Sequence, residues 1–227
     1  MSLSLIIGSR ASFLAKIQTF IVEQELRKKI KKIKIINKYH STGGDKNQGQ
    51  TPWKDLGYGV FTTSLTKQLL NKHYNCVVHS YKDLPILKSK TDYFTITRDD
   101  PRDLLLIKKA SLNKKKLTIG TSSPRRKSSV KDLKDLIGTN NIRTKTIRGN
   151  VSTRLLKVIS QNQYDGVFMA KAAIDRIFKY GNTDKGKING LNFLKRLKNF
   201  FVSFLSTLFP YLKIRSIAAF AIKTPSY

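Results

Sequence analysis

A hydroxyl-rich turn with two arginines occupies residues 120–126, which read GTSSPRR. Its polar residues are Thr121, Ser122, Ser123, Arg125 and Arg126. A glycine and three hydroxyls between a strand and the start of a helix offer backbone N–H groups and the positive end of a helix dipole to an anion. The arginines add planar guanidinium groups, which bind carboxylates or phosphates through paired hydrogen bonds. The turn predicts an anion site, although each hydroxyl taken alone is also typical of a helix N-cap.

Arginines recur at the next strand-to-helix turn, where Arg148 and Arg154 flank the segment GNVST. Each guanidinium group supplies further charged donors next to backbone N–H groups. Because the arrangement occurs twice, a polycarboxylate or phosphate ligand is favoured over helix capping alone.

One aspartate, Asp83, follows an apolar strand in VVHSYKDLP, residues 77–85. Carboxylates are scarce in this chain, which has 44 Lys+Arg against 14 Asp+Glu. Facing an arginine-lined cleft, a carboxylate could stabilise a developing cation or transfer protons. A salt bridge with Lys82 or a nearby arginine would explain the same residue. Spacing alone leaves both interpretations open.

The net charge of +30 first suggests nucleic acid or an anionic membrane as a partner. The lysines are spread along the whole chain without an aromatic-interleaved motif, and a general drift toward lysine at solvated positions explains the excess equally well. The longest apolar stretch, Phe200–Leu212, is too short to span a membrane. Neither a specific nucleic-acid partner nor a membrane is therefore predicted.

A single cysteine, Cys76, excludes an intrachain disulfide, and with three histidines no zinc-ligand spacing is present. No metal site is predicted. The N-terminal MSLSLIIGS lacks the basic and apolar regions of a signal peptide, so a cytoplasmic location is expected.

The elements that position these turns follow from apolar periodicity. Strands are predicted at Leu3–Gly8, 32–40, Cys76–His79, Phe94–Thr97, Leu117–Gly120, Thr144–Ile147 and Gly166–Ala170. Helices are predicted at 11–30, Val60–Lys72, Ser128–Leu136, Val151–Ile159 and Ala172–Phe178. Residues 41–59 and the segment GNTDKGKING are predicted as loops.

This alternation predicts an α/β fold with two hinged lobes and mainly parallel sheets. The first lobe comprises residues 1–99, and part of 208–227 could return to it. The second comprises residues 100–207, with a C-terminal extension in which the sequence pattern does not define the secondary structure. The boundary is expected at the charged turn 98–103, which reads RDDPRD. Two hinged α/β lobes usually hold a ligand between them, at the ends of their strands.

Eight segments together resemble porphobilinogen deaminase, also called hydroxymethylbilane synthase. They are GSRASFLAKIQT, TGGD, GVFTTSL, HSYKDLP, RDDPRD, GTSSPRRKSS, IRGNVSTRL and YDGVFMAKAAIDRI, in family order over roughly residues 4–180. HSYKDLP, GTSSPRR and RGNVSTR are highly specific in combination. The resemblance implies two lobes of the periplasmic-binding-protein type and favours catalysis over a salt bridge for Asp83.

The resemblance also implies an activity: a transferase that condenses porphobilinogen head to tail into a linear tetrapyrrole, releasing ammonia, in heme (porphyrin) biosynthesis. Its dipyrromethane cofactor is attached to a cysteine in a third domain. Asp83 matches the catalytic aspartate. The matching basic residues for substrate and cofactor carboxylates are Arg10, Lys82, Arg125, Arg126, Arg148, Arg154 and Arg176. The matching polar positions are Ser12, Gln18, Ser80, Thr121, Ser122 and Ser123. A monomer is implied.

The chain departs from the family pattern in three places. After Pro210 it reads YLKIRSIAAFAIK where the family continues with a Gly-Gln-Gly-Ala segment, so the chain is expected to be truncated before the third, α+β, domain. Cys76 does not match the cofactor-bearing position, and Tyr58 stands where the family usually has lysine. A non-catalytic, polycarboxylate-binding two-lobe remnant is therefore an alternative to an active deaminase, ahead of a basic nucleic-acid-binding protein.

Overall fold

The computed structural model of the 227-residue chain describes residues 3–41, 62–84, 91–111, 113–130, 141–183, 188–190, 192–193 and 221–222. The chain divides into two compact units. They are Met1–Arg98 with Thr183–Ile188, and Asp99–Asn182 with Asn189–Tyr227. Each unit combines a sheet with helices, so the predicted α/β class with two lobes is confirmed.

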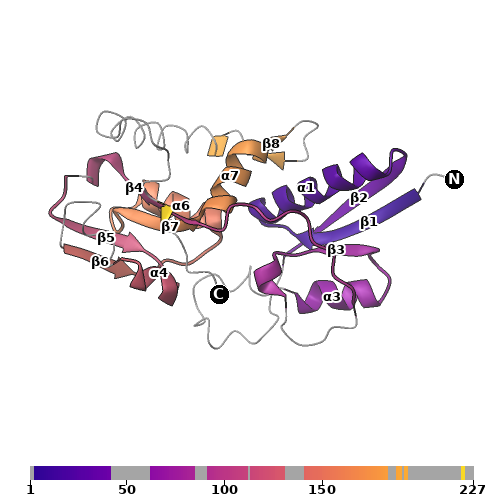
Figure 1. Ribbon diagram of the computed structural model, residues 1–227, viewed down its shortest axis with the longest axis horizontal. Helices are drawn as coiled ribbons and strands as arrows, with labels where there is room; N and C mark the ends of the chain where they lie inside the picture. Colours follow the sequence, from indigo (N-terminus) through magenta and orange to yellow (C-terminus); the bar gives the residue numbers. More distant parts are fainter. Residues whose placement is uncertain are drawn as a thin grey trace. The chain divides into compact units, whose positions relative to one another are not determined.

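The first unit is built on parallel strands in the order β2-β1-β3. Its elements are β1 (Leu3–Arg10), α1 (Phe13–Lys29), β2 (Ile33–His40), α3 (Thr63–Leu70), β3 (Cys76–Val78) and the 3₁₀ turn η1 (Tyr81–Asp83). The chain moves outward from β1 to β2 and then returns past β1 to β3. Since parallel crossovers are right-handed, the two connections place their helices on opposite faces of the sheet. Figure 1 shows α1 and α3 on either side of these strands.

A buried glutamate ties α1 to the sheet. Glu23 is 1% exposed, and its Oε1 accepts hydrogen bonds from Arg27 Nε and NH2 at 3.0 and 2.9 Å. Its Oε2 accepts from Asn37 Nδ2 on β2 at 2.8 Å. Full pairing offsets the cost of burying the carboxylate and fixes α1 along β2.

A close contact between Gly8 and Tyr74 fixes the end of β1. A Cβ added at Gly8 would lie 2.5 Å from Tyr74 Cδ2. Tyr74 is 6% exposed, and its hydroxyl hydrogen-bonds His40 Nε2 at the end of β2. The ring therefore packs directly on the β1 backbone two residues before Arg10.

The second unit holds strands in the order β10-β4-β7-β5-β6. These strands are β4 (Asp103–Ile107), β5 (Lys116–Gly120), β6 (Asn141–Lys145), β7 (Gly166–Ala170) and β10 (Ala221–Ile222). The helices and turn are η2 (Lys109–Ser111), α4 (Pro124–Ser128), α6 (Val151–Ser160) and α7 (Lys171–Tyr180). β5 is parallel to β6 and β7, whereas β4 is antiparallel to β7 and β10. The described end of the C-terminal segment, β10, thus pairs within the second unit.

The core of the second unit consists of apolar side chains from β4, β5 and β7, together with Val130 from the turn after α4. They are Leu105, Ile107, Leu117, Ile119, Val130 and Phe168, all at most 7% exposed. Asp165, which directly precedes β7, is also buried, with 7% of the residue exposed. Its carboxylate accepts hydrogen bonds from Ser111 Oγ at 2.8 Å, Lys114 Nζ at 2.7 Å and the Thr118 N–H at 2.8 Å.

Several element predictions were wrong. Residues 94–97 are not a strand, and Phe94 is 94% exposed. β4 was not predicted, because its residues followed directly on the charged turn. A helix was predicted to begin at Ser128, but α4 begins at Pro124, where Ser123 caps it and the proline occupies its first turn, and it ends at Ser128. Within GNTDKGKING, β8 (Asn182–Thr183) and β9 (Ile188–Asn189) pair with each other.

Other predictions lie outside the described residues: the loop 42–59 with Tyr58, residues 131–136 of the predicted helix, and most of 194–227. Where the structure describes the chain, it has no helix long and apolar enough to cross a bilayer. The same residues contain no cluster of three or more metal-ligating side chains.

Candidate active site

Arg10 and Asp83 meet at the edge of the first sheet. Arg10 is the last residue of β1, and Asp83 lies in η1, just past β3. β1 and β3 are parallel neighbours, so their carboxyl ends meet at one edge of the sheet, and ligands of open α/β sheets bind outside such carboxyl ends. Arg10 NH1 lies 3.8 Å from Asp83 Oδ2, with about a fifth of each side chain exposed (19% and 20%).

Gln18 and Ser80 link α1 to the same edge. Gln18 Nε2 donates a hydrogen bond to Ser80 Oγ at 3.0 Å. Ser12 occupies the N-cap position of α1, yet its side chain makes no capping hydrogen bond within the described residues. Lys82 is exposed on η1, between Tyr81 and Asp83. Four predicted site residues (Arg10, Gln18, Ser80 and Asp83) are thus held together by local contacts.

His79 lies near Arg10 and Asp83, and the sequence did not single it out. Burial lowers the pKa of its imidazole, the negative charge of Asp83 opposes that shift, and Arg10 adds to it. Its Nε2 is buried without a hydrogen-bond partner among the residues that the structure describes. A neutral imidazole therefore forms part of the surroundings of Asp83.

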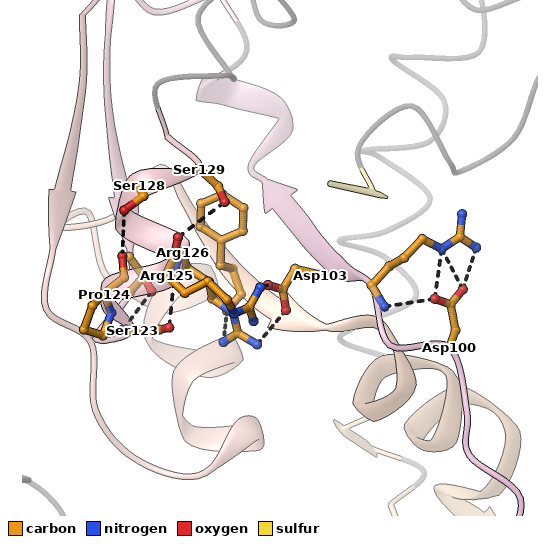
Figure 2. A network of polar contacts seen from close by, with 11 residues as sticks. Asp100, Asp103, Ser123, Pro124, Arg125, Arg126, Ser128 and Ser129 are labelled. Atoms are coloured by element: carbon orange, nitrogen blue, oxygen red, sulfur yellow. Dashed lines mark hydrogen bonds and ion pairs between the residues drawn. The ribbon is translucent and has the colours of Figure 1, made fainter. Parts of the chain in front are cut away.

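The second unit brings Arg125 and Arg126 to one buried carboxylate, that of Asp103. Arg125 NH1 lies 2.6 Å from Asp103 Oδ2, and Arg126 NH2 donates to Asp103 Oδ1 at 2.8 Å. Asp103 is 4% exposed. Figure 2 shows both arginine side chains of α4 pointing toward it.

Strand direction explains why Asp103 is available there. β5, β6 and β7 are parallel, so the turn that carries the arginines lies at the carboxyl end of β5. β4 runs the other way, and its first residue, Asp103, pairs with Ala170, the last residue of β7. An antiparallel strand thus delivers its amino end to the edge where the parallel strands finish. The sequence places Asp103 only in the charged boundary turn, because its pattern does not predict β4.

The next turn holds Arg148 and Arg154. Gly149 has a φ of 109°, which favours glycine, and Asn150 caps α6 by accepting from the Thr153 N–H at 2.9 Å. Arg154 Nε donates to the Gly149 carbonyl at 2.7 Å. Burial lowers the pKa of Arg154, and the nearby charge of Arg126 lowers it further. The two arginine turns therefore lie close enough to interact electrostatically.

The hydroxyls of the first arginine turn make local bonds. Ser123 Oγ accepts from the Arg126 N–H at 3.5 Å, and Thr121 Oγ1 accepts from the Ser123 N–H at 3.2 Å. Ser122 Oγ donates to the Ile147 carbonyl at 2.7 Å, which connects the two turns. These side chains shape the turn, as the helix-capping interpretation predicts.

Arg176, on α7, is paired with Asp99. Its Nε and NH2 both lie 2.5 Å from Asp99 Oδ2. Like Asp103, Asp99 belongs to the charged turn, so acidic residues of this segment pair with predicted ligand-binding arginines.

The structure groups the predicted residues within each unit. Their convergence from both units on one cleft stays a prediction.

Residues 5–193 match the family described as "Porphobilinogen deaminase, dipyromethane cofactor binding domain". A probable porphobilinogen deaminase of Picrophilus torridus is 40% identical over 75% of this chain and 59% of its own length. The Bacillus subtilis porphobilinogen deaminase is 37% identical over 75% of this chain and 54% of its own length. The chain therefore spans less than two thirds of these relatives.

Among solved structures, an arginine transport system periplasmic binding protein from Legionella pneumophila overlays with a TM-score of 0.35. It is 14% identical, and the match covers 93% of this chain and 97% of that protein.

Proposed function

Since the chain belongs to the porphobilinogen deaminase family, we propose that it acts in hydroxymethylbilane synthesis, the stepwise head-to-tail condensation of porphobilinogen with loss of ammonia. This transferase reaction belongs to tetrapyrrole and heme biosynthesis. Porphobilinogen and linear pyrrole intermediates are the proposed partners, and a cytoplasmic monomer is the proposed form. The observation that carries the proposal is the Arg10–Asp83 pair at the carboxyl ends of β1 and β3, in a family-matched α/β unit.

Asp83 is the proposed catalytic residue. When ammonia leaves an aminomethylpyrrole, the C–N bond breaks and positive charge develops on the methylene carbon and the ring nitrogen. A fixed carboxylate within reach stabilises that charge without reorganisation. The new C–C bond then forms to the free ring carbon of the next pyrrole, which loses its proton. Arg10, 3.8 Å from Asp83, supports a dual role for this edge, with an acidic group for the cation and a basic one for a carboxylate.

The arginines of both units are the proposed carboxylate ligands. Each porphobilinogen carries two carboxylates, so a growing chain needs many guanidinium donors. A hydrogen bond to a charged group contributes about 1.5–3 kcal/mol. Arg126 supports this role, because its buried Nε has no hydrogen-bond partner among the described residues. Ser12, Lys82, Arg148 and Arg176 are retained as proposed ligands on the family resemblance.

The donor set also fits a dipyrromethane, whose side chains are carboxylates. Such a group, when bound, supplies the pyrrole end to which the first substrate unit is joined. Arg125, Arg126 and Arg154 would bind its carboxylates. Cys76 is poorly suited to hold it covalently, because burial raises the pKa of its thiol and the nucleophilic form is the thiolate. We therefore propose that Cys76 is not the attachment point.

Carboxylate binding without turnover is the second candidate. It is favoured by the burial of Cys76 and by the arginine cluster, which the second unit assembles with its own Asp103. In this case the chain would capture porphobilinogen but release no ammonia.

One experiment separates the two candidates. The purified chain is titrated with porphobilinogen by calorimetry, and ammonia release is measured on the same samples. Binding with ammonia release supports the deaminase, and binding alone supports the second candidate. No binding at millimolar porphobilinogen would reject both. An Arg125→Gln/Arg126→Gln variant is the control, and weaker but still measurable binding in it assigns the lost affinity to the arginine cluster.

A further inference from the structure

We propose that Asp103 is a positioning residue, which holds Arg125 and Arg126 as one oriented pair of donors for a ligand carboxylate. The use of that pair for a carboxylate rests on the proposed function. The orientation itself follows from contacts within the second unit.

Each oxygen of Asp103 is assigned to a different arginine. Oδ2 lies 2.6 Å from Arg125 NH1, and Oδ1 accepts from Arg126 NH2 at 2.8 Å. One terminal nitrogen of each guanidinium is therefore committed to the protein. Since a guanidinium is planar, a bond to one nitrogen also limits the directions in which the others can donate.

The two arginines are held to different degrees. Arg126 has a 16% exposed side chain, and its NH1 also reaches the Phe168 carbonyl on β7 at 3.5 Å. Arg125 has a 46% exposed side chain. Arg126 is therefore the fixed member of the pair, and Arg125 is the member that solvent or a ligand reaches more readily.

A buried carboxylate suits this role better than a neutral residue. Arginine loses considerable rotamer freedom when it binds a ligand, and orientation in advance removes part of that cost. An asparagine at position 103 could accept from one guanidinium, but its NH2 group would face the donors of the other. Only a carboxylate of this size accepts from both.

Asp165 offers a matched control in the same unit. Asp165 is also a buried aspartate (7% exposed) that pairs with one cation, Lys114 at 2.7 Å, but it contacts neither arginine. Asp103→Asn and Asp165→Asn therefore remove similar groups, and both should lower the melting temperature. Only the change at Asp103 should affect the guanidinium groups.

The first measurement is independent of any ligand. ¹⁵N relaxation of the arginine Nε–H groups is recorded for the full chain and the two variants. We expect the order parameters of Arg125 and Arg126 to fall in Asp103→Asn and to stay at the wild-type value in Asp165→Asn. Unchanged order parameters in Asp103→Asn, or an equal fall in both variants, would overturn the proposal.

The second measurement is the dissociation constant for porphobilinogen. We expect Asp103→Asn to raise it about tenfold, the equivalent of one charged hydrogen bond, and Asp165→Asn to leave it unchanged. Asp103→Asn should have no further effect in an Arg125→Gln/Arg126→Gln background, because a positioning residue acts through the arginines. Tighter binding in Asp103→Asn would make Asp103 a competing countercharge and overturn the proposal.

The two measurements test two different claims, so one claim can be rejected while the other stands. If the wild-type chain binds no porphobilinogen, the proposed function fails, and the relaxation data still decide whether Asp103 orients the arginines. If binding is present and the order parameters do not change, the positioning role fails while the function stands.

Discussion

Arg10 NH1 and Asp83 Oδ2 lie 3.8 Å apart, at the point where β1 and β3 end side by side. The contact is an ion pair longer than a hydrogen bond, and a fifth of the Asp83 side chain is exposed. A bound molecule can therefore reach the carboxylate without first breaking a buried network. Such access is required of a carboxylate whose charge stabilises a bound ligand and not the folded structure.

Asp83→Asn tests that role. The amide keeps the size of the side chain and removes its charge, so a developing cation loses its stabilising partner. We expect the rate of ammonia release from porphobilinogen to fall by at least about a hundredfold. Because Asp83 is partly exposed, the free energy of unfolding should change little.

Asp92→Asn is the control, since Asp92 is an exposed aspartate in the same unit. It should leave both rate and stability unchanged. A near-normal rate in Asp83→Asn would reject catalysis and leave the salt bridge with Arg10 as the function of Asp83.

The partly buried imidazole of His79 predicts a pH effect on stability. Burial lowers its pKa in the folded chain, so below pH of about 6.5 the unfolded state binds more protons. The free energy of unfolding should fall as the pH drops from 7 toward 5, and His79→Gln should make that fall shallower. Urea denaturation at several pH values measures it. His73→Gln, which changes an exposed imidazole, should retain the wild-type slope.

Cys76 should not carry a covalent pyrrole. Its thiol is partly buried on β3, and burial raises its pKa, so little thiolate forms at neutral pH. Intact-protein mass spectrometry after incubation with porphobilinogen should show an unchanged mass. A mass increase equal to a dipyrrole, absent in Cys76→Ser, would show that this cysteine holds the cofactor.

Asp165→Asn should destabilise the second unit by about 3 kcal/mol at pH 7, because Lys114 loses its partner and the hydrogen bonds to Ser111 and Thr118 are disturbed. Chemical denaturation measures the change. Asp175→Asn removes an exposed carboxylate on α7 that pairs with Lys171, and should cost less than about 1 kcal/mol. Equal losses in the two variants would mean that Asp165 is not a structural anchor.

Local patterns predicted most of the elements: the buried residues of α6 recur at helical spacing, and β5 and β7 are short apolar runs that a glycine bounds. β4 is a buried apolar run of the same kind, but it was missed because it begins inside the charged turn, at Asp103. The error at residues 94–97 is the converse, since aromatic and β-branched residues there suggested a strand and yet are exposed.

Local sequence patterns also predicted only part of the candidate site. Arg125 and Arg126 were predicted because their turn has a recognisable composition. Their partner Asp103 was not, because it is near them only through strand order and direction. His79 was missed since a histidine in a strand-end turn has no distinctive spacing, and only burial sets it apart.

The contact of Gly8 with Tyr74 has a consequence for inherited variation. Any side chain at position 8 would collide with the ring, and the displaced backbone leads directly to Ser9 and Arg10. A survey of random substitutions should therefore score position 8 as intolerant as Arg10 itself, although glycine has no side chain with which to touch a substrate. A second change that removes the ring, such as Tyr74→Ala, should allow some substitutions at position 8 again. Substitutions at Arg10 should be tolerated no better than before.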